Sequence, residues 1–168
     1  MNNLALNKTL REEARKLGLC DEWYNDWSSF ESKKKLAEKY FRGIDFCIRH
    51  DYPKLNFIRE NFDKEFLISN GIFLDENVDA SNVVKVVLLG KSKGELRYYG
   101  TRSCDVYVRH SSDVRIVATE GAKIFVETYN NCHISANADE YSKIFVYRHG
   151  GSVDYEGNVV VKERVAVK

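Results

Sequence analysis

The second half of the chain contains an internal repeat, and such a repeat restricts the possible folds more than any other feature of this sequence. Successive copies recur with a period of about twenty residues, although the spacing is not perfectly even. Shorter apolar segments lie midway between the copies, and turn-forming residues separate them. The repeated segments are Lys85–Leu88, Asp105–Val108, Lys123–Val126, Lys143–Val146 and the weaker Arg164–Val167.

Each copy alternates as a β-strand does, so that Val106 and Val108 face one side of a sheet and Tyr107 faces the other. A β-solenoid stacks equivalent strands in parallel and explains why like positions recur. An antiparallel meander or sandwich has no need of near-identical strands and more often shows Asn-Gly hairpin turns. The repeat therefore favours a β-solenoid of about four to five coils. An antiparallel β-meander or sandwich is the alternative.

The first half carries helical signals. Thr9 and Glu12 have the form of a capping box, which predicts a helix from Leu10 to Leu17. An apolar stripe predicts one long helix over Ser32–His50. Residues 75–82 are polar and acidic and are expected to form a linker. The predicted class is therefore α+β, with a helical domain over residues 1–82 and a repeating β domain over residues 83–168. Solenoids need terminal caps, and we expect the helical domain to cap one end.

The period and alternation of residues 83–168 resemble those of short β-solenoids such as the bactofilins and, more distantly, the pectate-lyase-like β-helices. A bactofilin-like chain implies self-assembly into filaments, and a pectate-lyase-like chain implies sugar chemistry. The chain as a whole resembles uncharacterised proteins of gut anaerobes and their prophages, which implies no known activity.

The charge and the cysteines exclude several function classes. The chain has 26 Lys and Arg against 25 Asp and Glu, so a nucleic-acid partner is not expected. No apolar stretch could span a bilayer, and Met1–Lys8 lacks the apolar core of a secretory signal. We therefore expect a cytoplasmic protein without a membrane partner. The four cysteines form no CxxC pair and are expected to be reduced thiols without a metal.

No motif commits the chain to a reaction. Walker, GxSxG and HExxH sequences are absent. His110 and His149 fall about two coils apart in the predicted solenoid, too far to share a zinc ion or to form an acid/base pair. The carboxylates are scattered over loops and outward positions. The sequence therefore predicts no catalytic residue, no metal, no cofactor and no enzymatic activity.

The candidate site is an outward column of aromatic side chains. If the strands stack, Tyr107, Phe125 and Phe145 form a ladder with about 4.8 Å per step. Exposed aromatics beside arginine are typical of protein-binding hot spots. A sugar platform and a ladder covered by the helical domain are the alternatives. The nearby residues assigned to the same candidate site are Arg109, Tyr147 and Arg148.

A second outward column of charged residues is expected beside the ladder. It comprises Lys85, Asp105, Lys123 and Lys143, with Asp105 between two lysines. Such an order avoids like-charge neighbours and is assigned a structural role.

These features predict a non-catalytic protein-interaction module whose partner is another protein or a second copy of the chain. A mobile-element-encoded inhibitor and a structural factor are two versions of this hypothesis. A carbohydrate-binding or carbohydrate-active β-helix protein and a self-assembling bactofilin-like scaffold are the alternatives.

Overall fold

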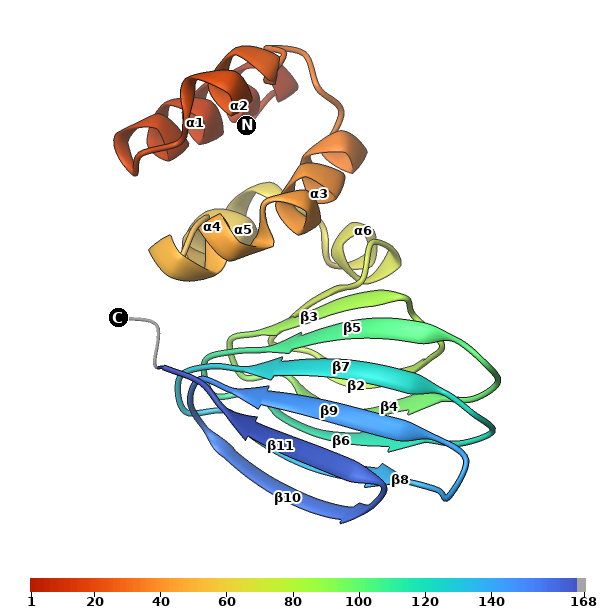
Figure 1. Ribbon diagram of the computed structural model, residues 1–168. Coiled ribbons are helices and arrows are strands. Elements are labelled where there is room, and N and C mark those ends of the chain that lie inside the picture. The colour runs from red at the N-terminus through yellow and green to blue at the C-terminus, as the bar shows by residue number, and fades with distance from the viewer. Residues whose placement is uncertain (166–168) are drawn as a thin grey trace. The chain divides into compact units, whose positions relative to one another are not determined.

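The computed structural model describes residues 1–165, which contain six helices followed by eleven strands (Figure 1). The chain divides into two compact units between Phe66 and Leu67. The helices are α1 (Asn3–Lys16), α2 (Asp21–Asp26), α3 (Lys33–Arg42), α4 (Ile44–His50), α5 (Leu55–Asn61) and α6 (Lys64–Ser69). The strands are β1 (Ile72–Leu74), β2 (Asn77–Ser81), β3 (Lys85–Leu89), β4 (Lys93–Tyr98), β5 (Ser103–Val108), β6 (Asp113–Ala118), β7 (Lys123–Thr128), β8 (His133–Ala138), β9 (Lys143–Arg148), β10 (Ser152–Gly157) and β11 (Val159–Glu163).

The first helix begins earlier than the sequence predicts. The side chain of Asn2 accepts a hydrogen bond of 2.9 Å from the backbone N–H of Ala5, so Asn2 is the N-cap of α1. The prediction of a helix start at Thr9 and Leu10 is therefore wrong. The helix extends back to the earlier cap, Asn2, because most residues between Asn2 and Thr9 are good helix formers.

The predicted long helix over Ser32–His50 is divided at Gly43 into α3 and α4. A Cβ atom at Gly43 would lie 3.2 Å from the ring of Trp23, so the chain turns where this ring packs. The core of the helical unit forms around this turn and joins residues of α1, α3 and α4. Its buried members are Leu6, Leu10, Ala14, Leu19, Trp27, Leu36, Cys47 and Tyr52.

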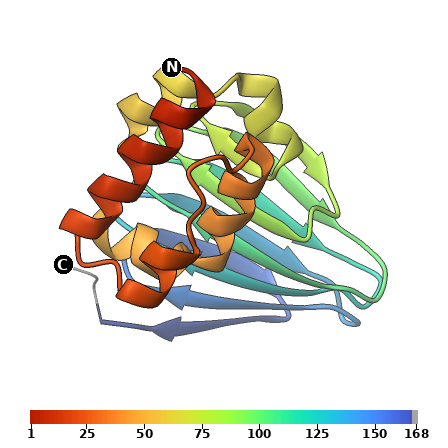
Figure 2. The ribbon, with the colours of Figure 1, turned by 90° about the horizontal axis from the view of Figure 1, so that it is seen from above.

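The strands from Ile72 to Glu163 form a parallel β-solenoid. In the described part of the chain one sheet has the order β1-β3-β5-β7-β9-β11 and the other has the order β10-β8-β6-β4-β2. Every pairing in both sheets is parallel, as in Val106 opposite Val126 and Val126 opposite Val146. Figures 1 and 2 show the strands stacked in chain order from green to blue. The predicted α+β class with a short β-solenoid is confirmed, and the antiparallel alternative is excluded. Capping by the helical unit stays a prediction.

The structural unit of the solenoid is a half-coil of ten residues. Strands β4 to β9 begin at Lys93, Ser103, Asp113, Lys123, His133 and Lys143, ten residues apart. A residue in the left-handed conformation recurs in the turns at the same interval, at positions 90, 100, 110, 120 and 130. Two half-coils form one coil, so each side chain stacks on its equivalent one full coil further along the chain.

Side chains in the turns connect neighbouring coils. The carboxamide oxygen of Asn130, which has φ 60°, accepts from the backbone N–H of His110 at 3.0 Å. Asp75 and Asn82 accept in the same way from the amides of Lys91 and Tyr99. These residues tolerate a positive φ and also satisfy a backbone donor of the next coil, which explains why Asn and Asp occur in the turns.

The solenoid starts and ends at other places than the sequence predicts. The predicted linker over residues 75–82 contains β2, which pairs with β4, so strands begin before the predicted domain boundary at residues 82 and 83. The weak copy predicted at Arg164–Val167 is wrong in its position, because the last strand is β11 and Arg164 and Val165 lie outside any strand. Residues 166 and 167 lie outside the described residues. A turn at Gly157 and Asn158 shortens the last half-coil and causes this shift.

The core of the solenoid is the column of inward side chains between the two sheets. The inward apolar residues of β3 to β9 are almost completely buried. Tyr98 is 1% exposed, and its hydroxyl has no hydrogen-bond partner among the described residues. Burial raises the pKa of Tyr98, which therefore stays neutral. A buried hydroxyl without a partner loses its hydration without compensation.

We expect Tyr98→Phe to raise the free energy of unfolding of the solenoid by about 1–2 kcal/mol, because it removes this hydroxyl and keeps the ring. Hydrogen exchange of the amides of β4 to β8 measures the change. Tyr155→Phe is the matched control, since Tyr155 occupies an inward position of β10 but is 60% exposed. A loss of stability in Tyr98→Phe would contradict the prediction and indicate a bonded hydroxyl.

Candidate functional site

Phe125 of β7 and Phe145 of β9 lie directly opposite each other on the outer surface of the sheet that contains β11. Their ring centroids are 5.3 Å apart and the ring planes differ by 8°, so the two rings stack. Both side chains are half-buried. The structure therefore brings together two of the three residues of the predicted ladder.

Tyr107 does not belong to this stack. It lies opposite Glu127, and Glu127 lies opposite Tyr147, one outward column further along the strands. The residue opposite Phe125 on β5 is Asp105. The prediction of a ladder of three aromatic residues is wrong because it placed Asp105 and Lys123 in equivalent positions, whereas in the structure the partner of Lys123 on β5 is Ser103.

The predicted charge column changes for the same reason. Lys85 does lie opposite Asp105, but the neighbour of Asp105 on its other side is Phe125. The expectation that Asp105 lies between two lysines is therefore wrong. Lys123 does lie opposite Lys143, as the order of the predicted column requires, and both are directly beside the stacked rings. Two like charges are thus neighbours on the sheet, which costs free energy unless something else compensates.

Cations surround the aromatic side chains. The Nζ atom of Lys143 is 5.4 Å from the ring centroid of Phe145. The guanidinium carbon of Arg164 and the Nζ atom of Lys162 are 4.9 Å and 5.8 Å from the ring centroid of Tyr147. These distances are within the range of cation–π attraction. We call this surface the aromatic face and define it by Lys123, Phe125, Lys143, Phe145, Tyr147, Lys162 and Arg164.

The two arginines of the predicted site lie elsewhere. Arg109 follows β5 and is buried, so it cannot present its guanidinium to a partner as an exposed hot-spot residue does. Arg148 occupies an inward position of β9. It lies opposite Thr128 on β7, which in turn lies opposite the inward Val108 on β5. Its Nε atom is 2.9 Å from the Oε1 atom of Glu163, and this ion pair ties β9 to β11.

A second aromatic pair lies in the turns that follow the strands of the aromatic face. The rings of Tyr129 and His149 stack with centroids 4.6 Å apart and planes 13° apart. The Nε2 atom of His149 is 3.3 Å from the Oε2 atom of Glu127, which also accepts a hydrogen bond from the hydroxyl of Tyr129. These contacts fix the position of Glu127, whose carboxylate lies opposite Tyr147 on the outer surface of the sheet.

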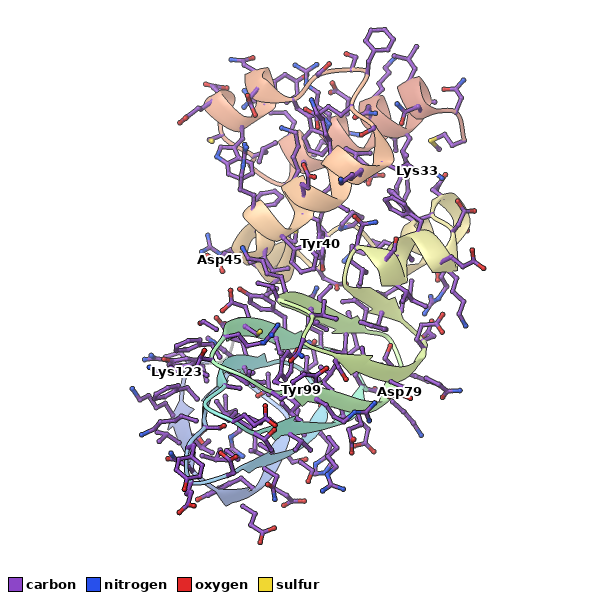
Figure 3. All side chains as sticks on the ribbon, turned by 90° about the vertical axis from the view of Figure 1, so that its right-hand side faces the viewer. Lys33, Tyr40, Asp45, Asp79, Tyr99 and Lys123 are labelled. Carbon is purple, nitrogen blue, oxygen red and sulfur yellow. The ribbon has the colours of Figure 1, made fainter. Side chains whose placement is uncertain are left out.

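The outer surface of the other sheet has a different character. Its charges pair with each other: Arg97 contacts both Asp79 and Glu95, and Arg115 lies 3.6 Å from Glu95. The outward positions of its strands β4, β6 and β8 carry no Phe, Tyr or Trp side chain. Figure 3 shows Asp79 of this sheet and Lys123 of the aromatic face on opposite sides of the solenoid, with Tyr99 in a turn between them. The aromatic face is therefore the distinctive surface of the two.

Sequence reasoning missed the cations of the aromatic face as members of a site, and a signal for them was present. A small buried residue precedes each of the strands β4 to β9 at ten-residue intervals, except at the exposed Arg102, and this series fixes the offset between coils. These residues are Ser92, Ser112, Ala122, Cys132 and Ser142. An alignment on this series would have placed Asp105 beside Phe125 and Tyr107 beside Glu127.

The groups of residues 1–165 that could bind a metal are thiols, imidazoles and carboxylates. No cluster of three or more His, Cys, Asp or Glu side chains that could hold a metal occurs in this range. All four cysteines are free thiols. Burial raises the pKa of the Cys132 thiol to about 11 and also raises the pKa of Cys104, so both are poor nucleophiles. No helix within the described range has both the length and the apolar character needed to cross a membrane.

No protein-family model matches the sequence, no curated protein matches it, and no solved structure matches its fold.

Proposed function

We propose that the chain is a non-catalytic protein-interaction module that binds an acidic protein surface through the aromatic face. The stack of Phe125 and Phe145, flanked by Lys123 and Lys143, carries this proposal. Aromatic side chains on a rigid sheet offer a large contact area at a low cost in conformational entropy. The parallel ladders hold both phenylalanines in place before a partner arrives.

The orientation of the rings favours a protein over a sugar. Phe125 and Phe145 stack along the direction in which the strands succeed each other, so each ring covers a face of the other. They present their edges to solvent. A sugar ring stacks on an open aromatic face, whereas apolar and aromatic protein side chains pack well against ring edges.

The charge of the aromatic face favours an acidic partner. Lys123, Lys143, Lys162 and Arg164 contribute four cations to it. The outward positions beside the rings add two carboxylates, Asp105 and Glu127, so the cations are in excess. Complementary charge raises the association rate and selects among partners, and salt weakens both effects.

This proposal includes a cytoplasmic location, in keeping with four free cysteines, two of which have raised pKa values and lie in the solenoid core. An inhibitor encoded by a mobile element would be one form of such a module, because an inhibitor needs a rigid binding surface and no catalytic group. A structural factor would be another.

Two double variants test the proposal in affinity capture from lysate, with the bound proteins identified by mass spectrometry. Phe125→Ala with Phe145→Ala removes the stack, and Lys123→Glu with Lys143→Glu reverses the charge beside it. We expect each to reduce capture of the specific protein at least about tenfold, since both aromatic anchors and complementary charges contribute at such centres.

The control changes the outer surface of the other sheet. Val117→Ala with Asn137→Ala alters two half-buried outward positions there and should leave capture unchanged. Circular dichroism establishes that every variant is folded. Equal capture by all variants would contradict the proposal. Binding to a member of a glycan panel that is lost with the phenylalanine variant would favour the carbohydrate alternative instead.

A further inference from the structure

The solenoid ends on two open strand edges. Among the described residues β10 pairs only with β8 and β11 pairs only with β9, so one edge of each strand carries backbone N–H and C=O groups without a neighbouring strand. The inward side chains of this last coil are less covered than those before it. Tyr155 is 60% exposed, whereas Ala136, opposite it on β8, is 1% exposed. The inward Val153, Val159 and Val161 are only partly buried.

The two edges carry opposite charges. The outward positions of β10 hold Asp154 and Glu156, and both side chains are exposed. The outward position of β11 at Lys162, and Arg164 directly after the strand, hold exposed cations. The backbone N–H of Arg164 donates to the carbonyl of Arg148 at 2.9 Å, so the chain still follows β9 at this point.

A twofold axis parallel to the strands would place these edges against each other. Such an axis stacks β10 of one copy on β11 of a second copy, with the strands antiparallel and their outward faces on the same side. Asp154 and Glu156 of each copy would then face Lys162 and Arg164 of the other. A twofold axis perpendicular to the sheets would instead oppose β10 to β10 and bring acidic residues together.

We propose that two copies of the chain associate end to end through β10 and β11, with β10 of each copy pairing with β11 of the other. This pairing supplies partners for the backbone groups of both edges, as strand addition does in other complexes. It also covers the partly exposed apolar residues of the last coil, including Tyr155. The interface is closed, because the twofold axis consumes both edges of each copy and leaves none for a third.

Charges on edge strands also serve to prevent association, and on this explanation the chain would not dimerise through these edges. Lysines and carboxylates at an edge discourage pairing with other chains. Protection of this kind needs no particular arrangement of signs. At the outward positions the acids lie on β10 and the cations at the end of β11, while Glu163 of β11 has the inward register and pairs with Arg148. This segregation is the observation that favours complementary pairing.

The test is a charge exchange followed by light scattering and analytical ultracentrifugation. Asp154→Lys with Glu156→Lys makes both edges basic, and Lys162→Glu with Arg164→Glu makes both edges acidic. We expect the wild-type chain to be a dimer and each variant alone to raise the dimer dissociation constant at least about tenfold. An equimolar mixture of the two variants should restore the dimer, because every contact across the interface then joins opposite charges.

Asp113→Lys is the matched control, since Asp113 is an exposed outward residue of the same sheet on the central strand β6. This variant should dimerise as the wild-type chain does. The wild-type dimer should also weaken as salt is added, which tests the role of charge without any substitution.

A wild-type chain that is monomeric at the highest soluble concentration would overturn the proposal, and so would open-ended oligomers. Failure of the folded variants to restore the dimer when mixed would overturn it as well. Lys162 and Arg164 belong to both the aromatic face and this interface, so their reversal is expected to change both functions. The variant Phe125→Ala with Phe145→Ala alters only β7 and β9 and should remain dimeric, which separates dimerisation from partner binding.

Discussion

Ile116→Ala will lower the free energy of unfolding of the solenoid by about 2–5 kcal/mol. Ile116 is 0% exposed and lies in the middle of β6, with Leu96 and Ala136 opposite it on the neighbouring strands. The substitution removes three carbon atoms from a close-packed interior and leaves a cavity. The parallel ladders fix the separation of the strands on both sides, so the surrounding backbone cannot move in to fill that cavity.

Hydrogen exchange of the amides of β4, β6 and β8 measures this loss, because these strands line the cavity. Val117→Ala is the matched control in the same strand. Val117 faces outward and is half-buried, so its truncation should cost less than about 1 kcal/mol. Similar losses for the two variants would show that the two sheets do not enclose a tight core.

The same inward column explains why the solenoid could be predicted from the sequence. Val106, Val126 and Val146 stack on each other because a parallel coil repeats its environment once per turn. Like residues therefore recur at like positions, which no antiparallel arrangement requires. The strand positions, the parallel class and the stack of Phe125 and Phe145 all followed from this physical constraint.

The register between coils could not be obtained from the alternation alone. A strand has a period of two, so a shift by two residues preserves which side chains face the core. The similarity of the Val-Tyr-Val segment at residues 106–108 to Ile-Phe-Val at 124–126 concealed such a shift. In the structure Cys104, not Val106, lies opposite Ile124. The error moved Tyr107 into the wrong column and placed Asp105 beside Lys123, whereas Asp105 lies opposite Phe125.

The positions of Arg109 and Arg148 could not be predicted from the alternation of the strands. Arg109 lies just past the end of β5, where the alternation stops, and it is buried. Arg148 continues the inward column at the end of β9, where the partner of its charge is Glu163. Similarly, the break at Gly43 follows from the packing of Trp23, a contact between two helices. Local propensity does not encode such contacts.

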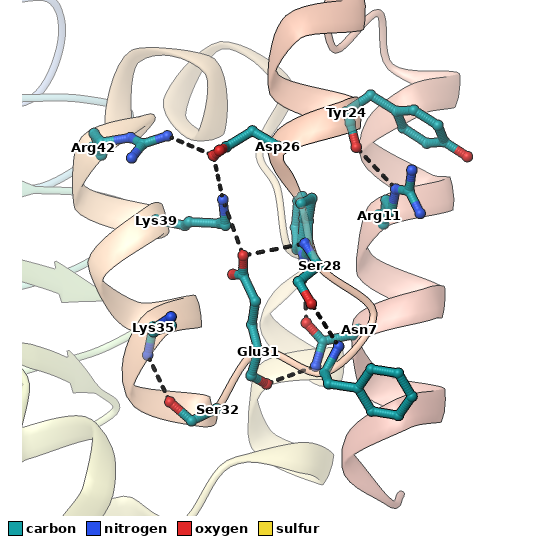
Figure 4. Close-up of polar contacts among 12 residues, drawn as sticks. Asn7, Arg11, Tyr24, Asp26, Ser28, Glu31, Ser32, Lys35, Lys39 and Arg42 are labelled. Atoms are coloured by element: carbon teal, nitrogen blue, oxygen red, sulfur yellow. Dashed lines mark hydrogen bonds and ion pairs between the residues drawn. The ribbon is translucent and has the colours of Figure 1, made fainter.

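Lys39→Met should destabilise the helical unit by about 3–5 kcal/mol. The Nζ atom of Lys39 lies 3.3 Å from the Oε1 atom of Glu31 and 3.0 Å from the Oδ2 atom of Asp26 (Figure 4). The side chains of Lys39 and Glu31 are only 13% and 8% exposed. The Oε2 atom of Glu31 has no hydrogen-bond partner in the described part of the chain. Removal of Lys39 therefore leaves a buried carboxylate without its counter-charge.

Tryptophan fluorescence during urea unfolding measures this change in the helical unit alone. The chain contains two tryptophans, Trp23 and Trp27, and both belong to the packed helices. Arg42→Met is the matched control. Arg42 also contacts Asp26, at 3.2 Å, but both side chains are largely exposed, so its loss should cost much less than the loss of Lys39.

The pH dependence provides a second readout. Hydrogen bonds from Lys39 and then Arg42 hold the pKa of Asp26 below its ordinary value. The stability that Asp26 contributes is thus fully present above its unfolded pKa and is lost as the pH falls through its lower folded pKa. In Lys39→Met this pKa should rise toward the ordinary value, and the acid-dependent loss that Asp26 contributes should shrink.

The double variant Lys39→Met with Glu31→Gln separates the lost charge compensation of Glu31 from the loss of the other contacts of Lys39. Glutamine keeps the shape of Glu31 and removes its charge, so the double variant should recover much of the stability that Lys39→Met loses. Recovery would show that the uncompensated carboxylate causes the loss. A double variant as unstable as Lys39→Met alone would contradict this explanation. It would assign the loss to the other contacts of the ammonium group, with Asp26 and with the ring of Trp27, whose centroid is 5.8 Å from the Nζ atom.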